Sequence, residues 1–162
     1  MPVPVSGRFE ELRDLCTEAD DKTSLAIGIT GVVSEHWQHA RMREGAELAS
    51  GQIALVESIG DPALIIGAAF SAVAIKSQSG EMADVLRWSQ TAIDWAEGDP
   101  ARGSLVVGSP LAVAMAFRGV ARWWFGRPGW HDDFDEATAI ARNAEPDDPR
   151  LCCRVEIRSS GR

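Results

Sequence analysis

Three basic side chains stand out because they lie in otherwise apolar stretches of the sequence. Arg118 and Arg122 are four positions apart in a run of Leu, Ala, Val, Met, Phe and Trp, so a helix places both on one face. Lys76 closes an earlier apolar run. Guanidinium and ammonium groups bind carboxylates through charged hydrogen bonds. The three are therefore candidate partner-binding residues; the alternative is that they are solvated ends of buried helices with their stems packed down.

A glycine-containing stretch, residues 103–108, has the glycine spacing of a phosphate-binding loop. That motif needs a lysine and then serine or threonine after its last glycine, and Ser109 and Pro110 occupy those positions. The only lysines in the chain, Lys22 and Lys76, lie elsewhere. We therefore expect no nucleotide cofactor.

Metal and nucleophile patterns are incomplete. His36 and His39 are three apart beside Glu35, but no third ligand of a catalytic zinc site is evident. The acidic run after His131 falls in the first turn of an expected helix, where carboxylates favour the positive end of the helix dipole. The chain contains no G-x-S-x-G sequence. We expect no metal, no cofactor and no catalysis.

Charge and cysteine usage exclude further classes. The 162 residues carry a formal net charge of −8, which opposes unaided binding to nucleic acids and anionic membranes. The most apolar run, residues 62–75, is shorter than the roughly 20 residues of a membrane span. Cys16 and the adjacent Cys152 and Cys153 lack the spacing of a disulfide framework. With no secretory pattern at the start, we expect a cytoplasmic protein.

Helix signals dominate the sequence. Asp61–Pro62 and Ser109–Pro110 each place an N-cap residue before a proline at the first helical position. Glycines stand where several apolar periodic runs end. The pattern predicts an all-α protein with helices over residues 8–19, 24–38, 40–58, 62–77, 81–97, 110–125 and 130–144.

The predicted helices alternate in character. Residues 62–75 and 110–125 are apolar nearly all round, whereas residues 40–58, 81–97 and 130–144 carry one apolar stripe. The Gly-Asp-Pro sequence ending at Pro62 recurs 38 positions later. Helix pairs with such a period predict a right-handed solenoid of about three pairs, because one pair cannot bury its own apolar face. The connection at residues 101–108 is unusually long. We expect an N-terminal extension (1–7), a helical domain (8–146) and an irregular tail (147–162).

Several phrases of the sequence resemble one family. They are residues 16–28 (CTEADDKTSLAIG), 44–49 (EGAELA), 57–62 (ESIGDP), 80–90 (GEMADVLRWSQ) and 108–112 (GSPLA). They look like the tetratricopeptide-like helical region of large mycobacterial regulators that join a class III adenylate cyclase domain, a P-loop ATPase domain and sometimes a LuxR-type helix-turn-helix. The resemblance spans roughly residues 8–146. The matching region includes neither the metal-binding aspartates of the cyclase, nor a Walker loop, nor the DNA-binding domain. The resemblance therefore implies the helical region standing alone.

The function expected on these grounds is a non-catalytic, cytoplasmic interaction or regulatory module that binds an acidic protein partner or a second copy of itself. Two alternatives remain. The apolar connection at residues 105–108 would line a ligand pocket in a small-molecule sensor. The chain would otherwise be a shortened relic of a larger regulator.

Overall fold

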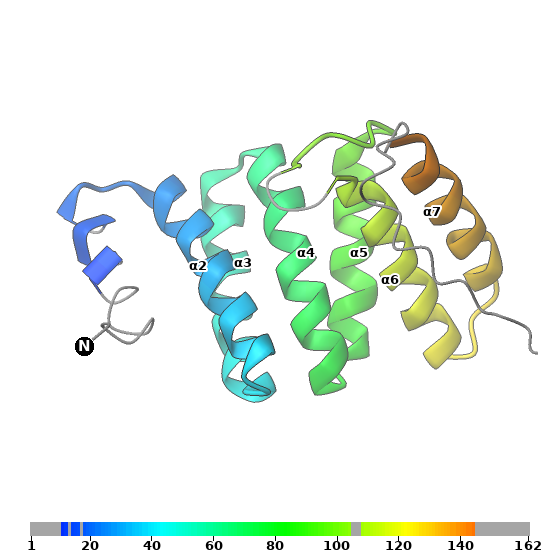
Figure 1. The fold of residues 1–162 in the computed structure, drawn as a ribbon, viewed down its shortest axis with the longest axis horizontal. Helices are drawn as coiled ribbons and strands as arrows, with labels where there is room; N and C mark the ends of the chain where they lie inside the picture. Colours follow the sequence, from blue (N-terminus) through cyan, green and yellow to red (C-terminus); the bar gives the residue numbers. More distant parts are fainter. Residues whose placement is uncertain (1–10, 13, 17, 105–107, 145–162) are drawn as a thin grey trace, which may run out of the picture.

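The computed structural model describes residues 11–12, 14–16, 18–104 and 108–144 (Figure 1). Within these ranges the chain is all-α, as predicted. The helices are α2 (Lys22–Gln38), α3 (Met42–Ile59), α4 (Pro62–Ser79), α5 (Met82–Ala96), α6 (Pro110–Trp124) and α7 (Trp130–Ala144). Described residues between 11 and 18 are helical too, in agreement with the first predicted helix. The expected extension (1–7) and tail (147–162), and residues 105–107 of the long connection, lie outside the described residues.

The two predicted N-caps and two of the predicted glycine stops are confirmed. The Asp61 carboxylate accepts hydrogen bonds from the backbone N–H groups of Ala63 and Leu64, and the Ser109 hydroxyl accepts one from the backbone of Ala112. The C-caps Gly60 and Gly80 adopt the left-handed conformation that glycine favours. These caps satisfy backbone groups that a helix end leaves without partners.

The first long helix begins two residues earlier than the periodicity indicated, because its cap lies outside the apolar pattern. The Asp21 carboxylate accepts hydrogen bonds from the side chain and backbone of Ser24. These bonds hold the pKa of Asp21 below its ordinary value, since they favour the ionised carboxylate.

The helices pack in sequence, each against the next. The backbone of α4 also approaches α2 and α6, whereas the backbones of α3, α5 and α7 do not approach one another closely in the described part of the chain. We call α2, α4 and α6 the first row, and α3, α5 and α7 the second row. The first-row helices all run downwards in Figure 1, so their C-terminal ends lie along one edge.

Helix α4 is the centre of the core. It is covered by neighbours on both sides, and nearly all its residues from Leu64 to Lys76 are buried, as its all-round apolar pattern predicted. Helix α6 is less covered than the same pattern predicted. No described first-row helix follows it, so Val113, Phe117 and Val120 remain half-buried. None of the described helices combines the length and apolar character that crossing a membrane requires.

A buried polar network joins the first three long helices at mid-height. The fully buried amide of Gln52 in α3 donates to the Thr30 hydroxyl at 2.7 Å and to the Ala26 carbonyl at 2.9 Å, both in α2. Its carbonyl oxygen accepts from the Ser71 hydroxyl in α4 at 3.2 Å. Since every polar atom of Gln52 has a partner, its burial fixes the register of three helices rather than opposing folding.

Gly103, after α5, lies against the start of α4. Its φ is +75°, and an added Cβ would meet the side chain of Ile66 at 2.7 Å and the carbonyl oxygen of Ala63 at 2.9 Å. Gly60 has a similar φ of +74° but open space where a Cβ would lie. The long connection is therefore anchored to α4 at a point that tolerates no side chain.

We predict that Gly103→Ala lowers the free energy of unfolding by about 2 kcal/mol more than Gly60→Ala, measured by urea denaturation. Both variants pay the left-handed backbone cost, of about 1 kcal/mol, but only Gly103→Ala adds a steric clash. Equal destabilisation of the two variants would show that the connection does not pack on α4.

Candidate functional site

Two of the predicted site residues, Arg118 and Arg122 of α6, bind the same carboxylate. The Asp133 side chain of α7 is 3% exposed. One of its oxygens accepts from Arg118 Nε at 3.1 Å and Nη2 at 2.6 Å, and both accept from Arg122 Nη1 at 2.9 Å. Arg118 also donates to the Gln90 side chain of α5 at 3.0 Å. The cluster therefore ties α6 to both second-row neighbours.

The local sequence creates this geometry. The four-residue spacing puts both arginines on one face of α6, as predicted, and Asp133 lies in the first turn of α7. Gly119 lets the two helices approach closely, because a Cβ there would lie 3.2 Å from Asp133 Cβ. Asp133 does lie in the first turn of α7, as expected from the sequence. Its ion pairs with Arg118 and Arg122 were not predicted. A basic pair on one helix followed by an acid in the next helix's first turn is the signal that would have found them.

Lys76, the third predicted site residue, is separate from the arginines. Its side chain is 2% exposed, and Nζ donates to Glu81 Oε2 and Asp84 Oδ2, each at 2.7 Å. Burial alone would lower the pKa of Lys76, but the hydrogen bonds to Asp84 and Glu81 together outweigh it and raise that pKa above its ordinary value. The bonds from Lys76 and Ser79 lower the pKa of Glu81. This ion pair therefore holds the start of α5 against the end of α4.

The two clusters follow one plan. Each uses a cation from the second half of a first-row helix and a carboxylate at the start of the next second-row helix. The structure thus divides Lys76 from Arg118 and Arg122 and gives each cation an internal counter-charge. Binding of an acidic partner by these three residues stays a prediction.

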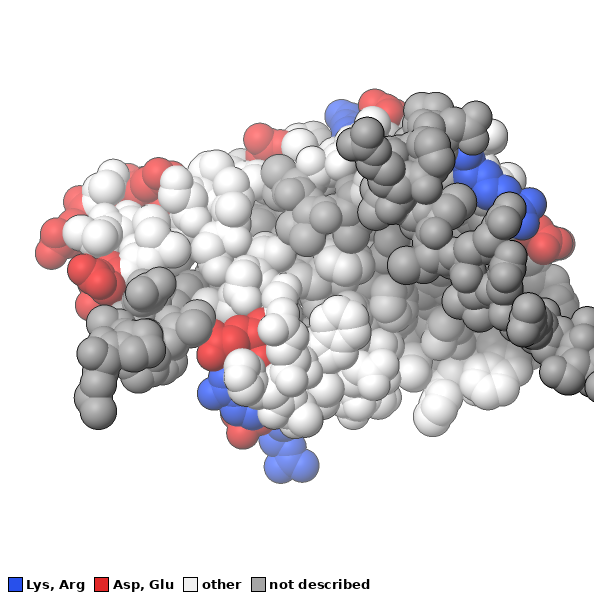
Figure 2. All heavy atoms as spheres, viewed as in Figure 1, with Lys and Arg blue, Asp and Glu red and all other residues white. Residues whose placement is uncertain are grey.

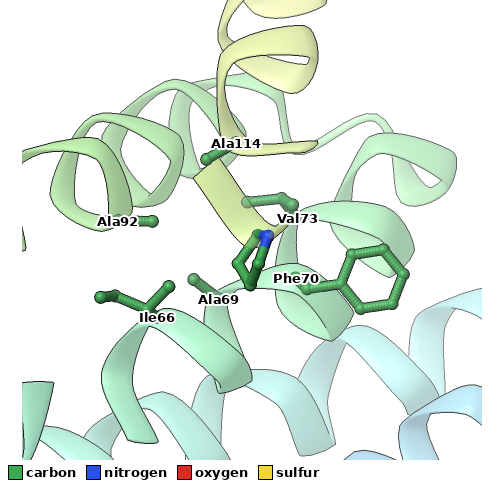
Figure 3. Close-up of a pocket in the computed structure, with 7 residues that line it drawn as sticks. Ile66, Ala69, Phe70, Val73, Ala92 and Ala114 are labelled. Carbon is green, nitrogen blue, oxygen red and sulfur yellow. The ribbon is translucent and has the colours of Figure 1, made fainter. Parts of the chain in front are cut away.

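A cavity of about 180 Å³ lies next to Lys76, between α3 and α5. Its wall includes Glu57 from α3 and Arg87 from α5, and the Arg87 guanidinium lies 4.8 Å from the centre of the Trp88 ring. The cavity is lined by Ser50, Ile53, Ala54, Glu57, Lys76, Asp84, Arg87 and Trp88. By contrast, the apolar crevice around Phe70 in Figure 3 leaves no volume for a water molecule, so it is packing and not a ligand site.

Exposed aromatic side chains gather at the C-terminal end of α6. Trp123 and Trp124 are each 59% exposed and Phe125 is 44% exposed; we call these three the aromatic edge. The Arg127 guanidinium lies 5.6 Å from the centre of the Phe125 ring. Trp37, also exposed, lies in the last turn of α2, which ends at the same edge of the first row. Figure 2 shows charged side chains at the rims of the described surface on this side, with uncharged surface between them.

The remaining sequence candidates have ordinary partners. His36 and His39 each make a ring hydrogen bond to a carbonyl of their own helix, at 3.0 and 2.9 Å. Within the described ranges, no three His, Cys, Asp or Glu side chains lie close enough together to hold a metal ion. Residues 105–107 of the glycine-containing loop, and Cys152 and Cys153, lie outside the described residues.

Comparisons of the chain with protein-family models, with curated proteins and with solved structures find no match. The function is therefore argued from the residues and geometry described above.

We predict that Asp133→Asn lowers the free energy of unfolding by about 3 kcal/mol, because two partly buried guanidinium groups lose their counter-charge. The exposed neighbour Asp132 provides the matched control, since it shares the first turn of α7. Asp132→Asn removes only a favourable interaction with the helix dipole, worth about 0.5 kcal/mol. Urea denaturation followed by circular dichroism measures both. Equal effects would contradict a structural role for the cluster.

The pKa shifts predict the pH dependence of the Lys76 cluster. Because the pKa of Glu81 is lowered from 4.5, its contribution to stability is present above that pH and is lost as the pH falls through the lowered value. The raised pKa of Lys76 preserves its contribution until the pH rises above 10.5. We expect Glu81→Gln to be less stable than wild type by under about 1 kcal/mol near pH 7, with the difference vanishing in acid. Glu136→Gln, at an exposed site on α7 outside the cluster, is the matched control.

Proposed function

We propose that this chain is a non-catalytic protein-interaction module with a tetratricopeptide-like, right-handed solenoid architecture. The alternation of contacts supports it: first-row helices contact one another, and second-row helices fill the spaces behind them. The 38-residue recurrence of Gly-Asp-Pro and the sandwiched α4 support it as well. The resemblance to the helical region of cyclase- and LuxR-type regulators agrees with this architecture.

The observation that carries the proposal is the aromatic edge. Two adjacent tryptophans and a phenylalanine, all largely exposed, form an apolar patch where a solvated helix end would normally carry polar residues. Clustered exposed aromatic residues mark protein-binding surfaces, and tryptophan is enriched among the residues that dominate binding energy.

The charge beside this edge indicates the partner's chemistry. The Arg127 guanidinium contacts the Phe125 ring, and no carboxylate of the described residues pairs with it. An apolar segment flanked by carboxylates would cover the aromatic edge and neutralise Arg127. A symmetric dimer through the same edge would place two Arg127 side chains at one contact, which disfavours a second copy. The partner proposed is therefore an acidic, partly apolar protein segment.

We predict that selection from a random peptide library on the purified chain enriches peptides combining aromatic or aliphatic residues with Asp or Glu. Trp124→Ala should weaken their binding at least about tenfold, because a truncated aromatic anchor costs more than 1 kcal/mol. Trp95→Ala is the matched control, since Trp95 is 43% exposed at the end of α5, away from the edge. Calorimetric titration measures the affinities. Peptides that tolerate Trp124→Ala, or no enrichment, would contradict the proposal.

The double variant Arg118→Ala and Arg122→Ala tests whether the partner binds at the aromatic edge or, as expected from the sequence, at the two arginines. If these arginines are structural, the double variant is destabilised, because Asp133 is left buried without a counter-charge. If it retains wild-type stability and loses the selected peptides, the arginines themselves bind the partner.

A further inference from the structure

The cavity between α3 and α5 offers a site distinct from the aromatic edge. Its 180 Å³ equals the liquid volume of about six water molecules. Pockets for drug-sized ligands span about 300 to 1,000 Å³. The part of a ligand that this solvent-open cavity encloses is therefore the size of a small metabolite.

The cavity wall presents hydrogen-bond donors for a carboxylate. An ammonium group has three N–H donors, and Lys76 uses one on Glu81 and one on Asp84. No third acceptor for this side chain, 2% exposed, exists among the described residues. The Arg87 guanidinium lies over the Trp88 ring and has no carboxylate partner in that part of the chain. A ligand carboxylate would accept the third hydrogen bond of Lys76 and form an ion pair with Arg87.

The same wall presents acceptors for an ammonium group. The Glu57 side chain makes no hydrogen bond or ion pair with any described residue. Asp84 bonds Lys76 through one oxygen, which leaves the other available. Ile53 and the Trp88 ring supply apolar wall between these charges. An anion alone would leave Glu57 without a counter-charge, and a cation alone would leave Arg87 without one.

We propose that this cavity binds a small zwitterion of the α-amino-acid class. The ligand carboxylate lies against Lys76 and Arg87, and its ammonium group lies against Glu57. Such a ligand contacts α3, α4 and α5 together, so its binding stabilises the stack in proportion to its occupancy. The protein would then respond to the concentration of a free amino acid.

The test is isothermal titration of the full chain with each of the common L-amino acids, alongside lactate and ethanolamine. These two compounds resemble a small amino acid that lacks the ammonium and the carboxylate, respectively. We expect at least one amino acid to bind, and to raise the melting temperature, at concentrations up to about 10 mM. Lactate and ethanolamine should bind at least about tenfold more weakly.

Variants locate the site. Arg87→Ala and Glu57→Gln alter exposed residues, so both should fold, and each should weaken amino-acid binding at least about tenfold. Arg43→Ala and Glu47→Gln, at exposed positions of α3 outside the cavity, should bind as wild type does. Absence of binding by every amino acid, equal binding of lactate or ethanolamine, or binding unaffected by both cavity variants would overturn the proposal. Peptide binding at the aromatic edge is measured separately, so failure of one proposal leaves the other intact.

Discussion

A charged side chain enters the packed interior of this stack only together with its counter-charge, and that constraint fixes how successive helices dock. An unpaired buried charge costs several kcal/mol, so α5 must bring Asp84 to Lys76 and α7 must bring Asp133 to Arg118. Both carboxylates lie in the first turn of their helix, where the helix dipole also favours negative charge. The ion pairs therefore set the register of the second-row helices, whereas apolar contacts alone would permit them to slide.

The buried amide of Gln52 applies the same principle without a charge. It satisfies hydroxyl and carbonyl groups on the helices at either side, so α2, α3 and α4 have one arrangement in which no partner is lost. Helix α4 is therefore held to both of its second-row neighbours by polar contacts: Ser71 bonds Gln52 of α3, and Lys76 bonds Asp84 of α5. The rest of its surface is mainly apolar and buried.

The two proposed sites lie where the helix packing leaves side chains uncovered or without a partner. The aromatic edge arises because α6 has no described first-row helix beyond it to cover its end. The cavity lies behind α4, where the backbones of α3 and α5 stay apart, and is bordered by Lys76, Glu57 and Arg87. One site is apolar and exposed, suited to a protein segment; the other is small and charged, suited to a metabolite.

The sequence by itself determined the features that depend on residues close together in the chain. Asp61, Ser109 and the capping glycines act on neighbouring backbone groups, so helix ends and the all-α class followed from short-range patterns. The all-round apolar character of α4 likewise indicated its burial. Pairing across helices was decided only by the tertiary structure, because it depends on the angle and separation at which helices meet. Lys76, Arg118 and Arg122 were recognised as unusual, but their carboxylate partners, the division into two clusters and the cavity beside Lys76 required the packed arrangement.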